Sequence, residues 1–197
     1  MDTEFKQSLF YMNAIPDTVR DAEEAYWIRL ARSGNESAFK WLLERYRSRA
    51  VRLASHILHG SGEAEDVAQE AFIRAFREIA HFREDSGFYT WLYRIVTRIC
   101  LDRQRLSRFK KETSHPIETC VSSDTNSDAR LLVESLLDKL SPSMRATLVL
   151  RELEGLEYEE IAKILGVPVG TIRSRLNTAR AQFRQLYTEA IKETNDV

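Results

Sequence analysis

Between Ile161 and Arg184 the chain carries basic residues and no acidic one, although its formal net charge is only −1. The basic residues are Lys163, Arg173, Arg175, Arg180 and Arg184, and they are interleaved with Thr171, Ser174, Asn177 and Thr178. Arginine can form paired hydrogen bonds with guanine, asparagine with adenine, and serine or threonine with either, while further cations neutralise phosphates. These residue types therefore predict a surface that reads duplex DNA.

The apolar spacing predicts two helices that would carry this surface. "YEEIAKILG" forms a short helix that Gly166 can end in a left-handed conformation. In the next helix one stripe of apolar residues faces the core, namely Ile172, Leu176, Ala179, Phe183 and Leu186. The polar residues then point outward, as in a helix-turn-helix. Taken alone, the segment is also compatible with a helical hairpin that has a solvated basic face.

A second basic segment lies between Trp91 and Lys111, where Asp102 is the single acidic residue. It follows a stretch rich in aromatic residues: Phe82, Phe88, Tyr89, Trp91 and Tyr93. Aromatic rings that stack on bases, next to cations that follow the backbone, are typical of single-stranded nucleic-acid binding. The alternative is that these aromatic residues belong to an ordinary core.

The composition favours an all-α protein of two small helical domains joined by a flexible linker. Seven Gly and four Pro among 197 residues leave little material for the turns of an all-β chain. We expect an acidic N-terminal extension at residues 1–21, a first helical domain at 22–106, a linker at 107–130 and a helix-turn-helix domain at 131–191. The linker is polar and shows no apolar period.

Several classes of protein are not expected. Cys100 and Cys120 lie far apart, and the four His residues lack ligand spacing, so we expect no metal site and no cofactor. Cys100 should be a small buried residue. There is no signal peptide pattern and no apolar run that would span a membrane, so a cytoplasmic protein without membrane insertion is expected.

Three stretches, in this order and spacing, resemble the extracytoplasmic-function group of bacterial RNA polymerase sigma factors: "AEDVAQEAFIRAFREI", "FYTWLYRIVTRICLDRQR" and "LRELEGLEYEEIAKILGVPVGTIRSRLNTAR". The resemblance implies that residues 22–106 form the region-two domain, which grips the polymerase clamp helices and melts the −10 element. It implies that residues 131–191 form the region-four domain, which reads the −35 element and contacts the polymerase flap. It also implies that the protein is not an enzyme.

The resemblance assigns roles to individual residues. Core-polymerase binding falls to Asp66, Gln69, Glu70, Phe72 and Arg74. Binding of the −10 DNA falls to Arg83, Ser86, Phe88, Thr90, Trp91, Arg94, Arg98 and Asp102. Binding of the −35 DNA falls to Arg151, Tyr158, Thr171, Arg173, Ser174, Asn177 and Thr178. A shaped pocket for a flipped base combines melting with specificity, because flipping costs a few kcal/mol of stacking.

Two positions depart from the family pattern. Arg98 stands where the family usually has Asn, which implies a changed base preference. Glu157 stands where the family usually has a Ser that caps a helix, so we expect a weaker cap there. The implied partners are core RNA polymerase, promoter DNA and an anti-sigma factor.

Two other functions remain open at this point. A stand-alone helix-turn-helix transcriptional regulator would explain the second half of the chain but not the basic and aromatic first half. A nucleic-acid enzyme is a weaker alternative, because we see no metal-binding carboxylate cluster and no phosphate-binding glycine loop.

Overall fold

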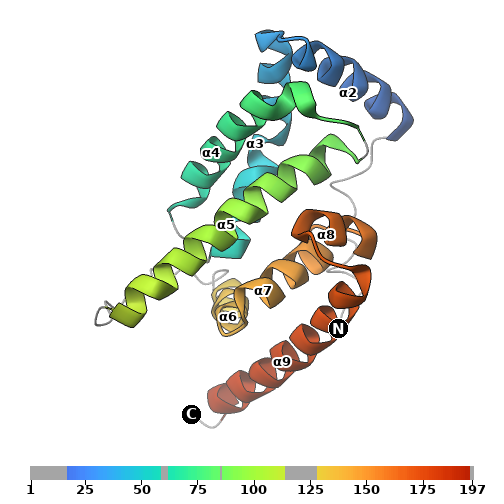
Figure 1. Cartoon of the computed structure of the whole chain (residues 1–197). Helices are drawn as coiled ribbons and strands as arrows, with labels where there is room; N and C mark the ends of the chain where they lie inside the picture. Colours follow the sequence, from blue (N-terminus) through green and yellow to red (C-terminus); the bar gives the residue numbers. More distant parts are fainter. Residues whose placement is uncertain (1–16, 59–61, 85, 114–127, 196–197) are drawn as a thin grey trace.

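The computed structural model describes residues 17–58, 62–84, 86–113 and 128–195 (Figure 1). Every regular element within these ranges is a helix, which confirms the predicted all-α fold. The first helical unit, residues 17–113, comprises α2 (Asp17–Arg32), α3 (Glu36–Leu58), α4 (Ala64–Glu78), the short 3-10 turn η2 (Ile79–His81) and α5 (Phe88–Thr113).

Local chemistry sets the helix boundaries of the first unit. Gly34 has a φ of 89°, which ends α2, and the backbone N of Ala38 donates to Oδ1 of Asn35 over 2.9 Å. Asn35 is therefore the N-cap of α3. α4 packs against α3 and α5, and one apolar stripe on it is buried and continues into η2: Val67, Ala71, Phe72, Ala75 and Ile79. Fully burying a large apolar side chain stabilises the fold by roughly 1.5–3 kcal/mol.

The second helical unit, residues 128–195, comprises α6 (Asp128–Asp138), α7 (Pro142–Leu148), the π-helical turn η3 (Val149–Leu153), α8 (Tyr158–Leu165) and α9 (Val169–Asn195). Gly166 has a φ of 65° and ends α8, as the sequence predicted. Ile172, Leu176 and Ala179 are buried on α9, and Phe183 and Leu186 pack at the edge of the core. The sequence did not indicate the π-helical turn.

Several boundaries differ from those expected. α2 begins at Asp17 instead of near Ala22, and α6 begins at Asp128 instead of Leu131. α5 continues to Thr113, past the expected end at Leu106. Its last turns lack an apolar period, but Arg and Lys are strong helix formers. The rest of the expected linker, including Cys120, and residues 1–16 lie outside the described residues.

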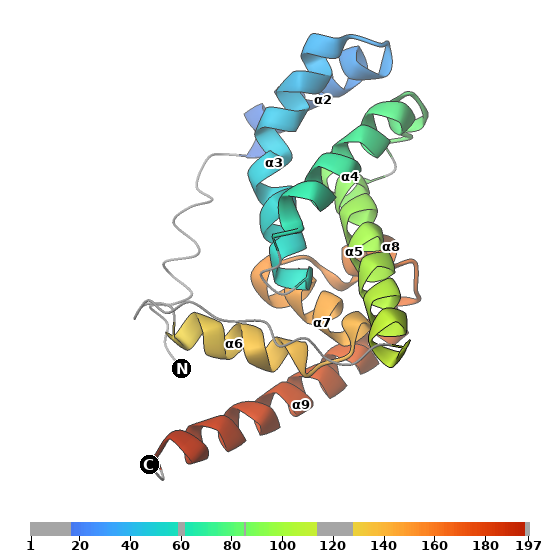
Figure 2. The ribbon, with the colours of Figure 1, turned by 90° about the vertical axis from the view of Figure 1, so that its left-hand side faces the viewer.

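The two units contact each other through α5 and α8, and through α7 with α3 and α5. Figures 1 and 2 show α8 and α7 against α5, with α9 farther from the first unit. Cys100 is buried in α5, as predicted, and burial raises the pKa of its thiol to about 12. None of the described helices is long and apolar enough to cross a membrane.

Candidate functional site

The surface of α4 carries most of the residues expected to bind the core polymerase. Asp66, Gln69 and Arg74 are exposed, and Glu70 is half-buried. Phe72 is only 4% exposed, so its side chain mainly fills the core. α4 brings the five residues onto one helix, and its acidic first turn suits the positive end of the helix dipole.

Glu70 is fixed by two arginines. Its Oε1 lies 2.5 Å from the Arg74 guanidinium on the same helix, and its Oε2 lies 3.0 Å from that of Arg103 on α5. Arg103 also reaches Oε2 of Glu63 over 3.4 Å. Partial burial opposes ionisation of Glu70, but hydrogen bonds and charge from Arg103 and Arg74 outweigh it and lower the pKa of this carboxyl. Glu70 is therefore held as an oriented carboxylate.

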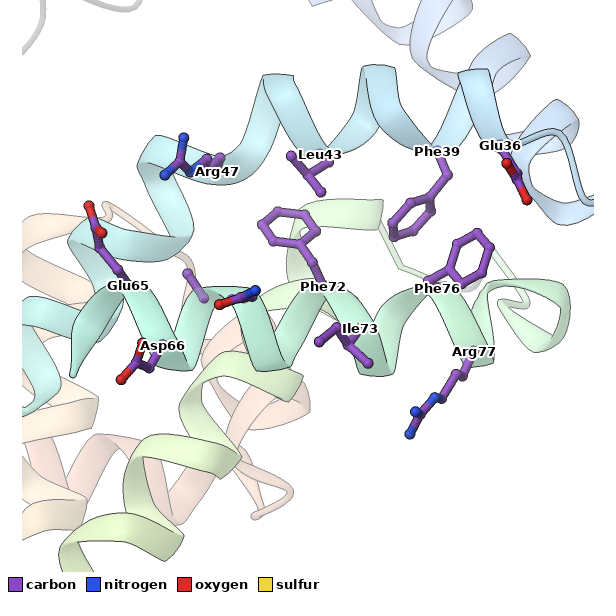
Figure 3. A pocket seen from close by; sticks show the side chains of 12 residues that line it. Glu36, Phe39, Leu43, Arg47, Glu65, Asp66, Phe72, Ile73, Phe76 and Arg77 are labelled. Atoms are coloured by element: carbon purple, nitrogen blue, oxygen red, sulfur yellow. The ribbon is translucent and has the colours of Figure 1, made fainter.

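An apolar groove runs between α3 and α4 and contains residues that the sequence interpretation missed. Figure 3 shows Leu43 and Phe39 of α3 facing Phe72 and Phe76 of α4 across it. The Phe39 and Phe76 ring centroids lie 5.0 Å apart. Phe76 is 48% exposed, and its neighbour Ile73 in the lining is 47% exposed. Both residues lie outside the core stripe of α4, which was the signal that could have identified them.

The residues expected at the −10 element fall into three groups. Arg83, Arg94, Arg98 and Asp102 are exposed, and Ser86 and Trp91 are half-buried. Phe88 and Thr90 are only 1% and 2% exposed. The first turn of α5 turns both side chains into the core, so neither is exposed to DNA in this conformation. Their assigned role in −10 binding stays a prediction.

Two buried aromatic rings, those of Phe82 and Phe88, pack against Trp91. The Trp91 ring lies 5.6 Å from that of Phe88 and 5.1 Å from that of Phe82, measured between centroids. The preceding loop is held by an ion pair of 2.6 Å between Glu84 and Arg32 of α2. Glu84 has a φ of 57°, which is unusual for a residue other than glycine. Glu84 therefore joins the segment before α5 to α2.

Part of the −10 surface is covered by the second unit. Nε of Arg94 donates to the backbone oxygen of Lys163 in α8 over 2.9 Å. The hydroxyl of Tyr93 donates to Oε2 of Glu154 over 2.7 Å, and that of Tyr89 donates to Glu160. Tyr93 is 2% exposed, and its burial, followed by the negative charge of Glu154, strongly raises the pKa of its phenol.

In the second unit, Arg151 is engaged with its own unit. Its guanidinium donates to the backbone oxygen of Leu156 over 2.7 Å and lies 3.0 Å from the carboxylate of Glu157. It also lies 5.1 Å from the ring centroid of Tyr158. Arg151 therefore stabilises the turn before α8, and its positive charge is partly neutralised by Glu157.

The N-terminus of α8 is capped despite the departure at Glu157. The backbone N of Glu157 donates to Oε2 of Glu160 over 2.9 Å. Glu160 therefore serves two contacts, one within α8 and one with Tyr89 of the first unit. The carboxylates of the first turn also suit the helix dipole.

The residues expected at the −35 element on α9 lie mostly on its outward face. Arg173, Ser174, Asn177 and Thr178 are exposed, and Thr171 is half-buried. The Ser174 and Thr178 hydroxyls donate to backbone oxygens one turn earlier, Thr171 O and Ser174 O, over 3.1 Å each. Their oxygens can still accept hydrogen bonds. α9 therefore presents several donors and acceptors on one face of a rigid helix.

The described residues bring no three His, Cys, Asp or Glu side chains together as a metal site. The sequence matches Sigma-70 region 2 over residues 42–109 and Sigma-70, region 4 over residues 130–183. The ECF RNA polymerase sigma-E factor of Escherichia coli (strain K12) is 36% identical over 173 residues, which cover 78% of this chain and 88% of that protein. This chain belongs to the ECF sigma factors of the sigma-70 family.

Further relatives agree with this assignment. The RNA polymerase sigma-H factor of Pseudomonas aeruginosa is 33% identical over 177 residues, covering 81% of this chain and 91% of that protein. Among solved structures, CnrH in complex with the cytosolic domain of CnrY has a TM-score of 0.65 at 26% identity, covering 83% of this chain and 96% of that one. The sigma factor RpoE of Bartonella quintana, in complex with the anti-sigma factor NepR, has a TM-score of 0.66 at 25% identity, covering 76% and 96%. As a sigma factor, the chain directs transcription initiation.

Proposed function

We propose that the two helical units divide the work of a sigma factor between three surfaces. α4 and the α3–α4 groove bind core RNA polymerase. α5 and the loop before it bind and open the −10 element, and α9 reads the −35 element in the major groove. The polymerase performs the chemistry, and the sigma factor supplies recognition in the cytoplasm. The single observation that carries this proposal is the exposed polar face of α9 in a chain whose other unit matches region two.

The groove supports the polymerase-binding part of the proposal. Exposed Phe76 and Ile73 share the lining of the groove with Asp66, Gln69 and Arg47. An apolar centre with a charged rim is typical of protein interfaces, where aromatic residues dominate the binding energy. An amphipathic helical partner would fit such a surface, with its apolar side against the phenylalanines.

We also propose that an anti-sigma factor controls this chain. Two structural neighbours, CnrH and RpoE, are bound to the cytosolic domain of CnrY and to the anti-sigma factor NepR, respectively. Such a partner would have to mask the polymerase-binding surface, a DNA-binding surface, or both.

A binding titration with purified core RNA polymerase tests the first part. Phe76→Ser should weaken binding of the full chain by about 2 kcal/mol, the size of a central aromatic contact. Leu106→Ser, at a residue that is 62% exposed on α5, is the matched control and should leave affinity unchanged. Equal affinity for the two variants would remove the groove from the polymerase interface.

A further inference from the structure

The contact between the two units places acidic side chains of the second unit next to Arg94, a residue expected at the −10 element. The first unit contributes donors, Tyr89, Tyr93 and Arg94 of α5 and Arg52 of α3, and the second contributes acceptors. Glu154 Oε1 lies 3.6 Å from Nε of Arg52, and the Glu154 carboxylate is only 6% exposed. Each acceptor is a carboxylate or a carbonyl oxygen.

These donors are of the kind that bind a nucleic-acid backbone. Arginine guanidinium groups and tyrosine hydroxyls donate to phosphate oxygens, and such contacts form a large share of protein–DNA hydrogen bonds. In this structure carboxylate oxygens of Glu154 and Glu160 accept the hydrogen bonds that the Tyr93 and Tyr89 hydroxyls could otherwise donate to phosphate oxygens. A single hydroxyl cannot donate a full hydrogen bond to a carboxylate oxygen and to a phosphate oxygen at the same time.

Promoter geometry requires the contact to break. Elements centred at −10 and −35 lie about 25 base pairs apart, which is about 85 Å at about 3.4 Å per base pair. Here Arg94, expected at the −10 element, is hydrogen-bonded at 2.9 Å to Lys163 of the helix-turn-helix. One duplex cannot present both elements to surfaces this close together.

We propose that Glu154 and Glu160 mimic DNA phosphates, so that closure of the two units and binding of the −10 strand exclude each other. This inference rests on the proposed function and adds Tyr89, Tyr93 and Arg52 to the DNA-binding surface. The apparent affinity for single-stranded DNA is then reduced by the fraction of molecules that are open. Opening upon polymerase binding would free the donors at the moment the strand arrives.

The test uses the full chain, an oligothymidylate of about a dozen nucleotides as the probe, and small-angle X-ray scattering. Glu154→Lys places a cation against Arg52 and should both increase the radius of gyration and tighten oligonucleotide binding about tenfold. Glu159→Lys is the matched control, because Glu159 is exposed on α8 and undergoes the same charge change. If Glu154→Lys matches Glu159→Lys in both measurements, the inference is overturned. A larger radius without tighter binding overturns it as well.

Two further variants guard against the possibility that Glu154→Lys simply impairs folding. Arg52→Glu repels the same carboxylate from a side chain that is 49% exposed, and should also expand the protein. The double variant with Glu154→Lys restores an opposite-charge pair and should return the radius of gyration to its compact value. A radius that stays expanded would contradict the proposed closure of the two units.

Tyr93→Phe, made in the Glu154→Lys background, removes a hydroxyl that no longer has Glu154 as its acceptor. It should weaken oligonucleotide binding severalfold if Tyr93 contacts the strand, and unchanged affinity would exclude Tyr93 from the DNA surface. None of these measurements uses polymerase. Failure of the inference would therefore leave promoter-specific transcription intact, whereas absence of transcription would contradict the proposed function alone.

Discussion

The two DNA-binding surfaces differ in how far they are available. On α9 the residues expected to read the −35 element project from a single helix, and Arg173, Ser174 and Asn177 are exposed. On α5 the expected −10 surface is partly core and partly covered by α8, since Thr90 is buried and Arg94 is hydrogen-bonded to Lys163. The comparison teaches that the outward face of α9 is exposed while the two units are in contact, whereas part of the expected −10 surface is not. Under the proposed inference, separation of the units would expose that part.

The difference extends to the way each surface is built. α9 needs only one buried stripe to aim its outward face. The expected −10 surface rests on an aromatic core and on the ion pair between Glu84 and Arg32 of α2. Damage to the core of the first unit should therefore have wider consequences than a change on the face of α9.

The largest effect is expected from the core of the first unit. Leu92→Ala empties a fully buried position in α5 and should destabilise the protein by about 2–5 kcal/mol. Chemical denaturation followed by circular dichroism measures this. Leu106→Ala, on the exposed side of the same helix, should change stability by less than about 0.5 kcal/mol. A loss of the same size at both positions would contradict the packing described.

The next effect separates base reading from support in the second unit. Arg173→Ala should weaken binding to the −35 element by about 1–3 kcal/mol and relax the preference at one base pair. Arg151→Ala should weaken binding to all sequences alike. Because Arg151 already contacts Leu156 O and Glu157, its loss should also lower the stability of the turn before α8. Titrations on duplexes varied one base at a time, at several salt concentrations, distinguish the two. An even loss across all duplexes for Arg173→Ala would show that Arg173 is not a base reader.

A third change probes the −10 surface alone. Arg98 is exposed on α5, and Arg98→Asn should shift the base preference at one −10 position by about 1–2 kcal/mol. It should leave binding to a duplex that carries only the −35 element unchanged. Competition between −10 sequences in the presence of core polymerase measures the shift. Altered −35 binding would contradict the separation of the two surfaces.

A smaller effect is expected at the turn of the helix-turn-helix. Gly166 has a φ of 65°, so Gly166→Ala should cost about 1–2 kcal/mol through left-handed strain. Gly170 lies within α9, where added volume would meet open space, so Gly170→Ala should be neutral or slightly stabilising. Thermal unfolding compares the two. Equal destabilisation by both changes would argue against backbone strain as the cause.

The smallest effect concerns pH and the polymerase-binding surface. The pKa of Glu70 is lowered in the folded protein, so its ion pairs stabilise the fold above the unfolded pKa. That stabilisation is lost as the pH falls through the folded pKa. The stability difference between wild type and Arg103→Ala should therefore shrink in acid. A difference that stays constant with pH would show that Arg103 does not act through Glu70.

Features that depend on apolar periodicity or on a helix-ending residue could be predicted from the sequence. The buried apolar stripe on α9 and the left-handed Gly166 are both present, because each depends on neighbouring residues. The burial of Phe88 and Thr90 was missed, since the rotation of α5 about its axis depends on packing against α3 and α4. The contact between Tyr93 and Glu154 was also missed, because these residues are separated by 61 positions and show no shared pattern.

Ile73 and Phe76, which line the groove, show a different limit of prediction from the sequence. Their apolar character was visible in the sequence, but a helix in a small protein often carries exposed apolar residues. Only the facing residues Phe39 and Leu43 of α3 show that these side chains line one groove. The assigned roles in polymerase and DNA binding remain predictions.

The most direct measurement is run-off transcription of fragmented genomic DNA from the source organism by its purified core RNA polymerase, with and without this chain. Mapped transcript starts should share two sequence elements at a constant spacing. Arg173→Ala should redistribute the upstream element, and Arg98→Asn the downstream one. A set of starts that this chain leaves unchanged, or blocks throughout, would contradict its role as a sigma factor with two separate promoter-reading surfaces.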